Sequence, residues 1–477
     1  MTYPDAIQFL YGLRLFGLNL GLENTFRLAA LAGNPQEKLR FIHVAGTNGK
    51  GSTCAMLESI YRAAGLRVGL FTSPHLVSFR ERIQVNRQLI AESAVARLVD
   101  EMQRLLVHFD PEGRAGFQPA GSAGIPARSW VTADTDAAST ARRDACPTFF
   151  EVVTVMALRY FAEEQCDLVI WETGLGGRLD ATNIVTPLAS VISNIQFDHQ
   201  NWLGNTRAEI ATEKAGIIKP GRPVITATDA PEALEVIART AREKNAPLIK
   251  VGQASSLSPA GVLPALPLLG AHQRLNAAVA VATVKALQAI IPVTHHAVRL
   301  GLETVQWSGR LQVVKTKSGP TFLLDGAHNA DGAEALRSAL GSEAIRAAIS
   351  AQRPEADGKP CREEPGVTLI LGVLEDKDWQ TICQTLAPLA RRIFLAPVSN
   401  ERTAPPQTLR DACAQANPAA ETIACPSLAD ALNRVSHDPL VVITGSLYLV
   451  GEAMELLQLS PDGAVGERGL NEWTLKK

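Results

Sequence analysis

A short glycine-rich segment, Gly46–Ser52, carries the strongest chemical signal in the sequence. It reads Gly-Thr-Asn-Gly-Lys-Gly-Ser, follows the apolar run Phe41–Val44 and opens a stretch with helical character, Ser52–Ala64. Glycines let backbone N–H groups approach phosphate oxygens, a helix N-terminus favours negative charge, and Lys50 adds a cation. The segment therefore predicts a nucleotide phosphate site. Its predicted nucleotide contacts are Gly46, Thr47, Asn48, Gly49, Lys50, Gly51 and Ser52.

This segment departs from the strict Walker pattern for phosphate binding. Val44 occupies the position of the first glycine, and Gly51 stands where a hydroxyl residue normally follows the lysine. A tight strand-to-helix turn that binds nothing is the alternative interpretation. The lysine at the mouth of the helix, with the hydroxyls of Ser52 and Thr53 beside it, favours phosphate binding. The segment alone does not specify the reaction.

Short apolar runs alternate with helical segments along most of the chain, a pattern typical of βαβ units and a mainly parallel sheet. After 41–44, strands are predicted over 68–71, 168–171, 190–193 and 224–226, and a helix over 276–290. A second series begins near residue 308. Its predicted strands are 321–324, 368–371, 393–396 and 440–444, and its predicted helices are 333–340, 379–389, 407–414 and 447–457.

These two series predict an α/β protein of two domains. Residues 1–300 are expected to form a P-loop ATPase-type domain that binds ATP and substrate, and residues 308–477 a smaller Rossmann-like α/β domain. Residues 110–147 and 351–365 are rich in small residues, proline and arginine and have no helical or strand period. They are predicted to be surface insertions, one in each domain.

The composition limits the binding partners and the cellular location that can be expected. Among 477 residues, 46 basic and 48 acidic side chains give a formal charge of −2, which supplies no general attraction to nucleic acid or membranes. The first residues do not form a basic segment followed by an apolar one, as a secretory signal would. No run approaches the roughly 20 apolar residues that span a bilayer. The seven cysteines are scattered without a Cys-x-x-Cys pair, which indicates reduced thiols. We therefore expect a cytoplasmic protein with small-molecule substrates.

The phosphate segment resembles that of the Mur ligase superfamily, and the Gly-Ser after Lys50 resembles folylpolyglutamate synthases and the bifunctional dihydrofolate synthases. The cell-wall branch more often has Thr-Thr there. The resemblance runs from Gly21 to Gly451 and fails mainly in the two insertions. Gln312 and Ala330 also depart from it, since an acidic residue and a proline are usual there. The collinear motifs that carry it are Thr72–Leu76, Glu81–Ile83, Gly174–Asn183, Leu203–Gly204, Glu213–Ile218, Asp325–Asn329 and Val442–Tyr448.

The resemblance implies ATP as co-substrate and Mg²⁺ in two sites. Glu172 follows a predicted strand, where a parallel sheet places ligands, although a carboxylate there could simply favour a helix N-terminus. By resemblance, Ser73 and Glu172 hold the ATP-bound magnesium. His199 and Lys214 hold the second, provided that CO₂ has carbamylated the lysine into an oxygen ligand. The alternatives are a structural histidine and a surface lysine paired with Glu209 or Glu213.

Residues from both predicted domains are implied around the substrates. Asn276, Arg310 and Asp325 resemble the nucleotide contacts, and His328 lies close to the reacting centre as a third catalytic residue beside Lys50 and Lys214. The folate-type substrate is expected between three segments, 19–22, 148–151 and 179–181. These contribute Asn19, Leu20, Gly21, Leu22, Thr148, Phe149, Phe150, Glu151, Leu179, Asp180 and Ala181. Core packing for the two phenylalanines and helix capping for Glu151 are the alternatives.

The function implied by the resemblance is ATP-dependent ligation of L-glutamate to a folate-type carboxylate through an acyl phosphate, by a monomer. Both tetrahydrofolate polyglutamylation and conversion of dihydropteroate to dihydrofolate are expected. A cell-wall ligase acting on a UDP-sugar is one alternative, which the residues after Lys50 disfavour. A non-catalytic ATP-binding switch is another, which would not need Ser73, Glu172, His199 and Lys214 together. The glycines of Gly174–Gly177 do not fit the dinucleotide fingerprint, which disfavours a nicotinamide enzyme.

Overall fold

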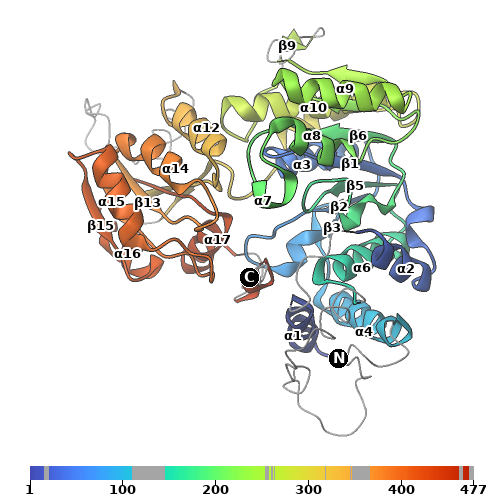
Figure 1. Cartoon of the computed structure of the whole chain (residues 1–477), viewed down its shortest axis with the longest axis horizontal. Coiled ribbons are helices and arrows are strands. Elements are labelled where there is room, and N and C mark those ends of the chain that lie inside the picture. The colour runs from blue at the N-terminus through green and yellow to red at the C-terminus, as the bar shows by residue number, and fades with distance from the viewer. Residues whose placement is uncertain are drawn as a thin grey trace, which may run out of the picture.

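The computed structural model describes residues 1–14, 21–109, 146–252, 257–258, 261–262, 264–316, 319–343, 345, 366–460 and 466–471. Nearly all of both predicted insertions lies outside these ranges, as do Asn19 and Leu20. The described residues form two α/β domains that face each other (Figure 1). Among them, no helix has the length and apolar character needed to span a bilayer.

An eight-stranded sheet forms the centre of the first domain, in the order β4-β3-β2-β5-β1-β6-β7-β8. The six strands from β2 to β8 in this order run parallel, whereas β3 and β4 form an antiparallel hairpin at the edge. The strands are β1 (Phe41–Ala45), β2 (Val68–Phe71), β3 (Ile83–Val85), β4 (Gln88–Leu89), β5 (Leu168–Glu172), β6 (Ala189–Ile192), β7 (Val224–Thr226) and β8 (Leu248–Lys250).

Helices cover both faces of this sheet, so its central strands are buried throughout, as parallel strands usually are. One core lies under α1 (Tyr3–Leu13), α2 (Glu23–Leu31), α4 (Glu92–Phe109) and α6 (Phe149–Glu163), around the fully buried Trp171. The other lies under α3 (Lys50–Ala63), α10 (Ala271–Ala286) and α11 (His295–Glu303). The remaining helices are α7 (Gln200–Leu203), α8 (Arg207–Ala215) and α9 (Pro231–Glu243).

The second domain contains a six-stranded sheet in the order β11-β12-β16-β13-β14-β15, with only the edge strand β11 antiparallel. Two cores pack on its faces. Its strands are β11 (Gln312–Lys315), β12 (Thr321–Leu324), β13 (Val367–Leu371), β14 (Ala390–Leu395), β15 (Glu421–Ala424) and β16 (Leu440–Thr444). Its helices are α12 (Ala330–Leu340), α14 (Trp379–Leu386), α15 (Pro406–Ala416), α16 (Leu428–Arg434) and α17 (Leu447–Leu456).

The predicted fold class is confirmed, and the predicted strands are present with small shifts at their ends. The strand predicted over 190–193 spans Ala189–Ile192, and the Ser193 hydroxyl that follows it donates to the Asn48 carbonyl at 2.6 Å. The helix predicted from Ser52 starts at Lys50, after Gly49 in the left-handed conformation (φ 82°). The helix predicted over 276–290 spans Ala271–Ala286 instead. The hairpin β3–β4 was not predicted.

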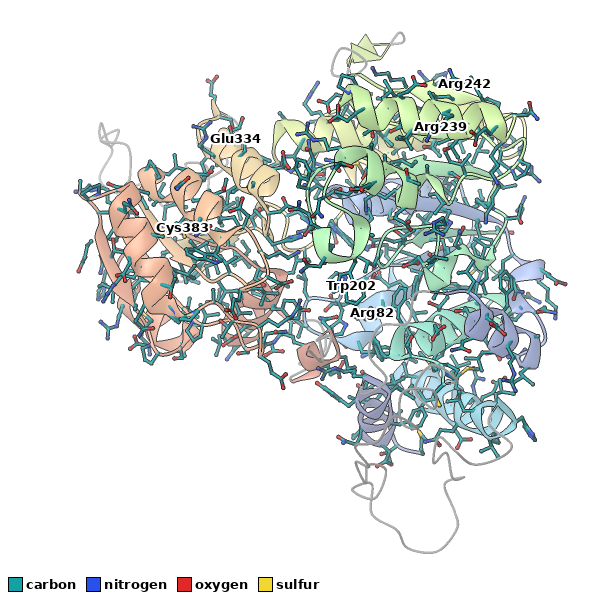
Figure 2. The ribbon with its side chains drawn as sticks, in the orientation of Figure 1. Arg82, Trp202, Arg239, Arg242, Glu334 and Cys383 are labelled. Carbon is teal, nitrogen blue, oxygen red and sulfur yellow. The ribbon has the colours of Figure 1, made fainter. Side chains whose placement is uncertain are left out.

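The stretches of chain before β11 and after α17 both contact the first domain. Helix α11 packs on α3, and Val305 belongs to the first-domain core, so this domain continues past residue 300. Near the C-terminus, Glu467 accepts hydrogen bonds from the Tyr3 hydroxyl (2.9 Å) and the Phe79 N–H (2.7 Å), both in the first domain. Figure 2 shows Trp202 and Arg82 on the part of the first domain nearest the second, and Arg239 and Arg242 on the outward-facing α9.

Candidate active site

The predicted phosphate loop connects β1 to α3 at the carboxyl edge of the parallel sheet. Lys50, the first residue of α3, folds back so that its Nζ donates to the carbonyls of Gly46 (3.0 Å) and Thr47 (3.2 Å). The loop is held from the end of β6, where the Asn194 side chain accepts from the Asn48 N–H at 2.7 Å. The loop thus has a cation and a helix N-terminus at one place, as phosphate binding requires.

Three glycines of this loop have no room for a side chain. A Cβ at Gly46 would lie 1.9 Å from Ser193 Oγ, and one at Gly49 would lie 2.4 Å from Asn276 Oδ1. At Gly51 it would lie 2.9 Å from the indole of Trp307. The departure from the Walker pattern at Gly51 therefore has a packing reason, since Trp307 covers the position of the usual hydroxyl residue. Asn276 is placed directly beside the loop.

Glu172, the last residue of β5, is buried next to the loop that contains Ser73. Its Oε2 accepts from the Ser73 N–H at 3.2 Å. Burial raises the pKa of Glu172 to about 7, while the cations of Lys50, Arg310 and Arg82 act in the opposite direction. One carboxylate, one hydroxyl and the phosphates of a nucleotide are a ligand set that suits Mg²⁺, which takes few ligands from the protein.

Lys214, on α8, is buried beside the phosphate loop rather than exposed. Its Nζ donates to the Gly46 carbonyl at 2.9 Å, the same oxygen that Lys50 contacts. The alternative pairing partners are engaged elsewhere: Glu209 caps α8 through Thr206, and Glu213 pairs with Arg178 at 2.8 Å. Burial lowers the pKa of Lys214 to about 7, and the Lys50 ammonium adds to this shift. The interpretation of Lys214 as a paired surface lysine is wrong.

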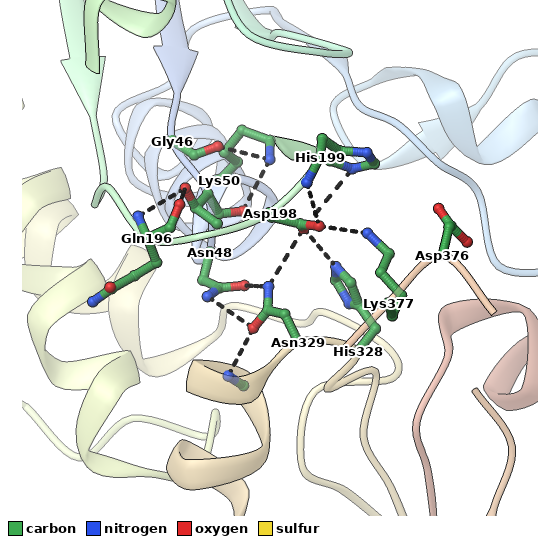
Figure 3. Close-up of polar contacts among 12 residues, drawn as sticks. Gly46, Asn48, Lys50, Gln196, Asp198, His199, His328, Asn329, Asp376 and Lys377 are labelled. Atoms are coloured by element: carbon green, nitrogen blue, oxygen red, sulfur yellow. Dashed lines mark hydrogen bonds and ion pairs between the residues drawn. The ribbon is translucent and has the colours of Figure 1, made fainter. Parts of the chain in front are cut away.

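Asp198 is the centre of a polar cluster that joins the two domains (Figure 3). It pairs with Lys377 Nζ at 2.5 Å and accepts from Asn329 Nδ2 at 3.4 Å, and His328 Nε2 lies 3.5 Å away. These three residues belong to the second domain. Asn329 also exchanges two hydrogen bonds with Asn48 of the phosphate loop, at 3.1 and 3.3 Å. The domains therefore meet directly at the predicted nucleotide site.

His199 precedes α7 in a left-handed conformation (φ 51°), with its side chain 42% exposed. Its Nε2 lies 3.8 Å from Asp198. Partial burial lowers the pKa of His199, and the ammonium groups of Lys377 and Lys214 contribute to this shift. A neutral imidazole near Lys214 suits a metal ligand. A bare Lys214 ammonium does not, so the second metal set fits only a carbamylated lysine.

Arg310 and Asp325 lie where the chain enters the second domain. Asp325 accepts from the backbone of Leu311 (2.9 Å) and Ala327 (3.0 Å), so it shapes the loops on either side. Burial lowers the pKa of Arg310, while the carboxylates of Asp325 and Glu172 oppose the shift. Arg310 belongs to the linker and lies near Glu172, the buried carboxylate of the first domain. Gln312, which departs from the usual acidic residue, accepts from the Gly309 N–H at 2.9 Å.

The segments predicted to hold the folate-type substrate are neighbours in the structure wherever they are described. Elements α2, α6 and the turn Ala181–Ile184 contact one another. Gly21 and Leu22 precede α2, and Thr148 to Glu151 start α6. Phe150 is half-buried against Gly174, beside the loop of Leu179, Asp180 and Ala181. Asn19 and Leu20 lie outside the described residues.

Several of these residues also have structural roles; those of Glu151 and Phe149 are the stated alternatives, whereas that of Asp180 was not predicted. Glu151 caps α6 by accepting from the Thr148 N–H at 2.7 Å, and Asp180 accepts from the N–H groups of Leu175 (2.7 Å) and Thr182 (3.0 Å). Phe149 is a core residue that packs edge-on against Phe79. Unlike Phe149, Phe150 is only half-buried, so its ring is the one that keeps a partly accessible face.

The sequence interpretation missed Asp198 and Lys377. Asp198 lies in the loop after β6 and Lys377 in the loop after β13, and such loops follow the carboxyl ends of parallel strands, where ligands bind. Applying that rule to each strand of both domains would have pointed to these two loops. The rule gives no information on their mutual contact, which depends on how the two domains face each other.

A phosphate loop opposed by a second α/β domain is the arrangement of a two-domain ligase, and comparison with known proteins agrees. Residues 309–447 match the family model described as Mur ligase, glutamate ligase domain. The chain is 34% identical to the dihydrofolate synthase/folylpolyglutamate synthase of Bacillus subtilis, over 96% of this chain and 99% of that protein. It is 33% identical to the Escherichia coli protein of the same description, over 96% of each chain.

Solved structures agree with these relatives. The crystal structure of folylpolyglutamate synthase from Thermotoga maritima is 30% identical, covers 98% of each chain and gives a TM-score of 0.74. Escherichia coli FolC in complex with DHPP and ADP is also 30% identical with a TM-score of 0.74, over 96% of this chain and 98% of that one. The chain belongs to the folylpolyglutamate synthase/dihydrofolate synthase family, the members of which are ATP-dependent ligases.

Proposed function

We propose that this protein ligates L-glutamate to a folate-type carboxylate at the expense of ATP. The substrates would be a tetrahydrofolate, extended by polyglutamylation, and dihydropteroate, converted to dihydrofolate. The observation that carries this proposal is the convergence of Lys50 and Lys214 on one carbonyl of the phosphate loop, beside the buried Glu172, in a chain that matches such ligases from end to end. A binding module would not need this concentration of buried charge.

The proposed reaction has two steps. An oxygen of the substrate carboxylate attacks the γ-phosphorus of ATP, the bond to ADP breaks, and an acyl phosphate forms. The glutamate amine then attacks the acyl carbon and loses a proton, and phosphate leaves as the amide forms. Lys50 and Arg310 stabilise the charge on the transferred phosphate. His328, with Nδ1 2.8 Å from the Gly326 carbonyl and Nε2 3.5 Å from Asp198, would help to orient the glutamate or the phosphate.

Magnesium is the cofactor that this chemistry calls for. Ser73 and Glu172 would hold one ion with the nucleotide, and His199 with a carbamylated Lys214 would hold the second. When bound, the ions supply positive charge for phosphoryl transfer. The protein's own contribution is to hold Ser73 after β2, Glu172 at the end of β5, His199 before α7 and Lys214 on α8.

A monomer would suffice for this reaction, because the phosphate loop and the second-domain residues that face it belong to one polypeptide. We therefore propose a monomer. ATP and folates are substrates of the cytoplasm, which is the proposed location.

An ADP-release assay tests the function directly. The wild type should release ADP only when glutamate is present together with dihydropteroate or a tetrahydrofolate, and mass spectrometry should find a product one glutamate heavier. Lys50→Ala should lower kcat by a factor of about 100 or more, because a transition-state cation is lost. Lys244→Ala, an exposed lysine far from the loop, is the control. ADP release that required a UDP-sugar instead, or that persisted in Lys50→Ala, would refute the proposal.

A further inference from the structure

The turn of the β3–β4 hairpin contains an arginine in a conformation that usually belongs to glycine. Asn86 (φ 50°) and Arg87 (φ 66°) are the two central residues of this turn, and Val85 pairs with Gln88 across it. Two-residue turns of this kind prefer Asn-Gly, because L-residues are disfavoured in the left-handed region. Asn86 has a clear role here, since it exchanges hydrogen bonds with the backbone of Val68 at 2.8 and 2.9 Å. Arg87 adopts this disfavoured conformation while its side chain makes contacts outside the turn.

The Arg87 side chain reaches the linker between the two domains. Its Nη2 donates to the Gln306 carbonyl at 2.8 Å, and its guanidinium carbon lies 5.4 Å from the centre of the Trp307 ring. A planar guanidinium suits both contacts at once, because it can stack on a ring while an N–H donates in its plane. The buried carboxylate of Glu58 lies close enough to Arg87 to counter the fall in the arginine's pKa that burial causes.

Trp307 in turn lies against the start of the phosphate-loop helix. Its ring occupies the space where a side chain of Gly51 would be. Three residues later the linker presents Arg310, after Gly309 in a left-handed conformation (φ 69°). Val305, before the contact, is anchored in the first-domain core. The linker residues Gln306 and Trp307 are therefore held against the first domain shortly before the chain reaches Arg310.

We propose that Arg87 is a positioning residue that fixes the interdomain linker through Gln306 and Trp307, and thereby places Arg310 over the phosphate site. This inference rests on the proposed function, because Arg310 is taken to stabilise the transferred phosphate. Arg87 itself does not touch the reacting atoms. Its effect should therefore appear in turnover and in the position of the second domain, more than in the affinity for ATP.

Replacing Arg87 by glycine is an unusually clean test, because glycine suits the turn better than arginine does. Arg87→Gly should fold normally and bind a fluorescent ATP analogue within threefold of the wild type, yet lower kcat by a factor of about ten. Arg87→Lys should recover only part of the loss, since it restores the charge but not the planar stacking. The matched control is Gln165→Gly, which relieves the same kind of backbone conformation (φ 51°) after α6, away from the linker. It should leave kcat unchanged.

A second readout separates this inference from the proposed function. Fluorescence energy transfer between labels on α9 and α15 reports the domain arrangement without any turnover. Arg87→Gly and Trp307→Ala should both broaden or shift this distance in the presence of ATP analogue, and Gln165→Gly should not. If Arg87→Gly keeps the wild-type kcat and distance, the positioning role is wrong. If the wild type shows no ligase activity but the distance still depends on Arg87, only the proposed function fails.

Discussion

Lys377 of the second domain and Asp198 of the first form an ion pair at 2.5 Å, with their side chains 9% and 8% exposed. A buried pair of this kind is costly to break from one side, because the remaining charge is left without its partner. Together with the Asn48–Asn329 contact, this pair holds the two domains together beside the phosphate loop.

We predict that Lys377→Met shifts the domain equilibrium toward an open arrangement, at a cost of about 3 kcal/mol to the closed one. Small-angle scattering should show a larger radius of gyration for the variant in the absence of nucleotide. Arg402→Met is the control, since it breaks an ion pair of 3.0 Å with Asp376 inside the second domain. Identical scattering from Lys377→Met and the wild type would show that the pair does not hold the domains together.

Carbamylation of Lys214 is a prediction that an isotope experiment can test. Burial lowers the pKa of its amine to about 7, so the uncharged, reactive amine is far more accessible near neutral pH than in an exposed lysine. In ¹³C-bicarbonate, the wild type should show one protected carbamate resonance that Lys214→Ala lacks. Lys219→Ala, a neighbouring lysine that donates to the Asn183 carbonyl, should retain the resonance. Full activity in CO₂-free buffer, with no resonance, would contradict the prediction.

Gly51 should tolerate no side chain while Trp307 covers it. The Cβ of Gly51→Ala would lie 2.9 Å from the ring, and overpacking of this kind costs about 1–3 kcal/mol. We expect weaker binding of ATP by Gly51→Ala, measured by calorimetry, and restored affinity in the double variant Gly51→Ala/Trp307→Ala. Gly12→Ala is the control, because a Cβ there meets nothing within 4 Å. Unchanged affinity in Gly51→Ala would mean that the ring moves aside freely.

The alternation of short apolar runs and helical segments predicted both α/β domains, because local periodicity reports which side of an element is buried. The phosphate loop could be predicted equally well, since its glycines and its lysine stand within one short segment. Gly46 and Gly49 have positive φ angles, and Gly51 leaves room for the Trp307 ring. The burial of Lys214 could not be predicted from the sequence in the same way. In the sequence it stands beside Glu213, and only the fold shows that Glu213 turns outward to Arg178 while Lys214 turns inward.

Contacts between distant parts of the chain account for what the sequence did not predict. The Asp198–Lys377 pair joins residues 179 positions apart, and its geometry depends on the orientation of two domains. The hairpin β3–β4 was missed because Arg87 stands where the usual Asn-Gly turn would have its glycine. For Glu151 the sequence left substrate binding and helix capping open, because both roles need the same carboxylate; the structure shows the cap.

The described C-terminal residues should matter for the stability of the first domain. Glu467 accepts from Tyr3 Oη (2.9 Å), Ser78 Oγ (3.0 Å) and the Phe79 N–H (2.7 Å), all largely buried groups of that domain. Glu467→Ala would leave these donors without their acceptor, and unpaired buried donors cost about 1–3 kcal/mol each. We therefore expect the free energy of unfolding, measured with urea, to fall by about 3 kcal/mol. Tyr3→Phe removes a single bond and should cost less. Glu334→Ala, which breaks an exposed pair with Arg337, should change it by less than about 0.5 kcal/mol. An equally small effect for Glu467→Ala would show that the first domain folds independently of this segment.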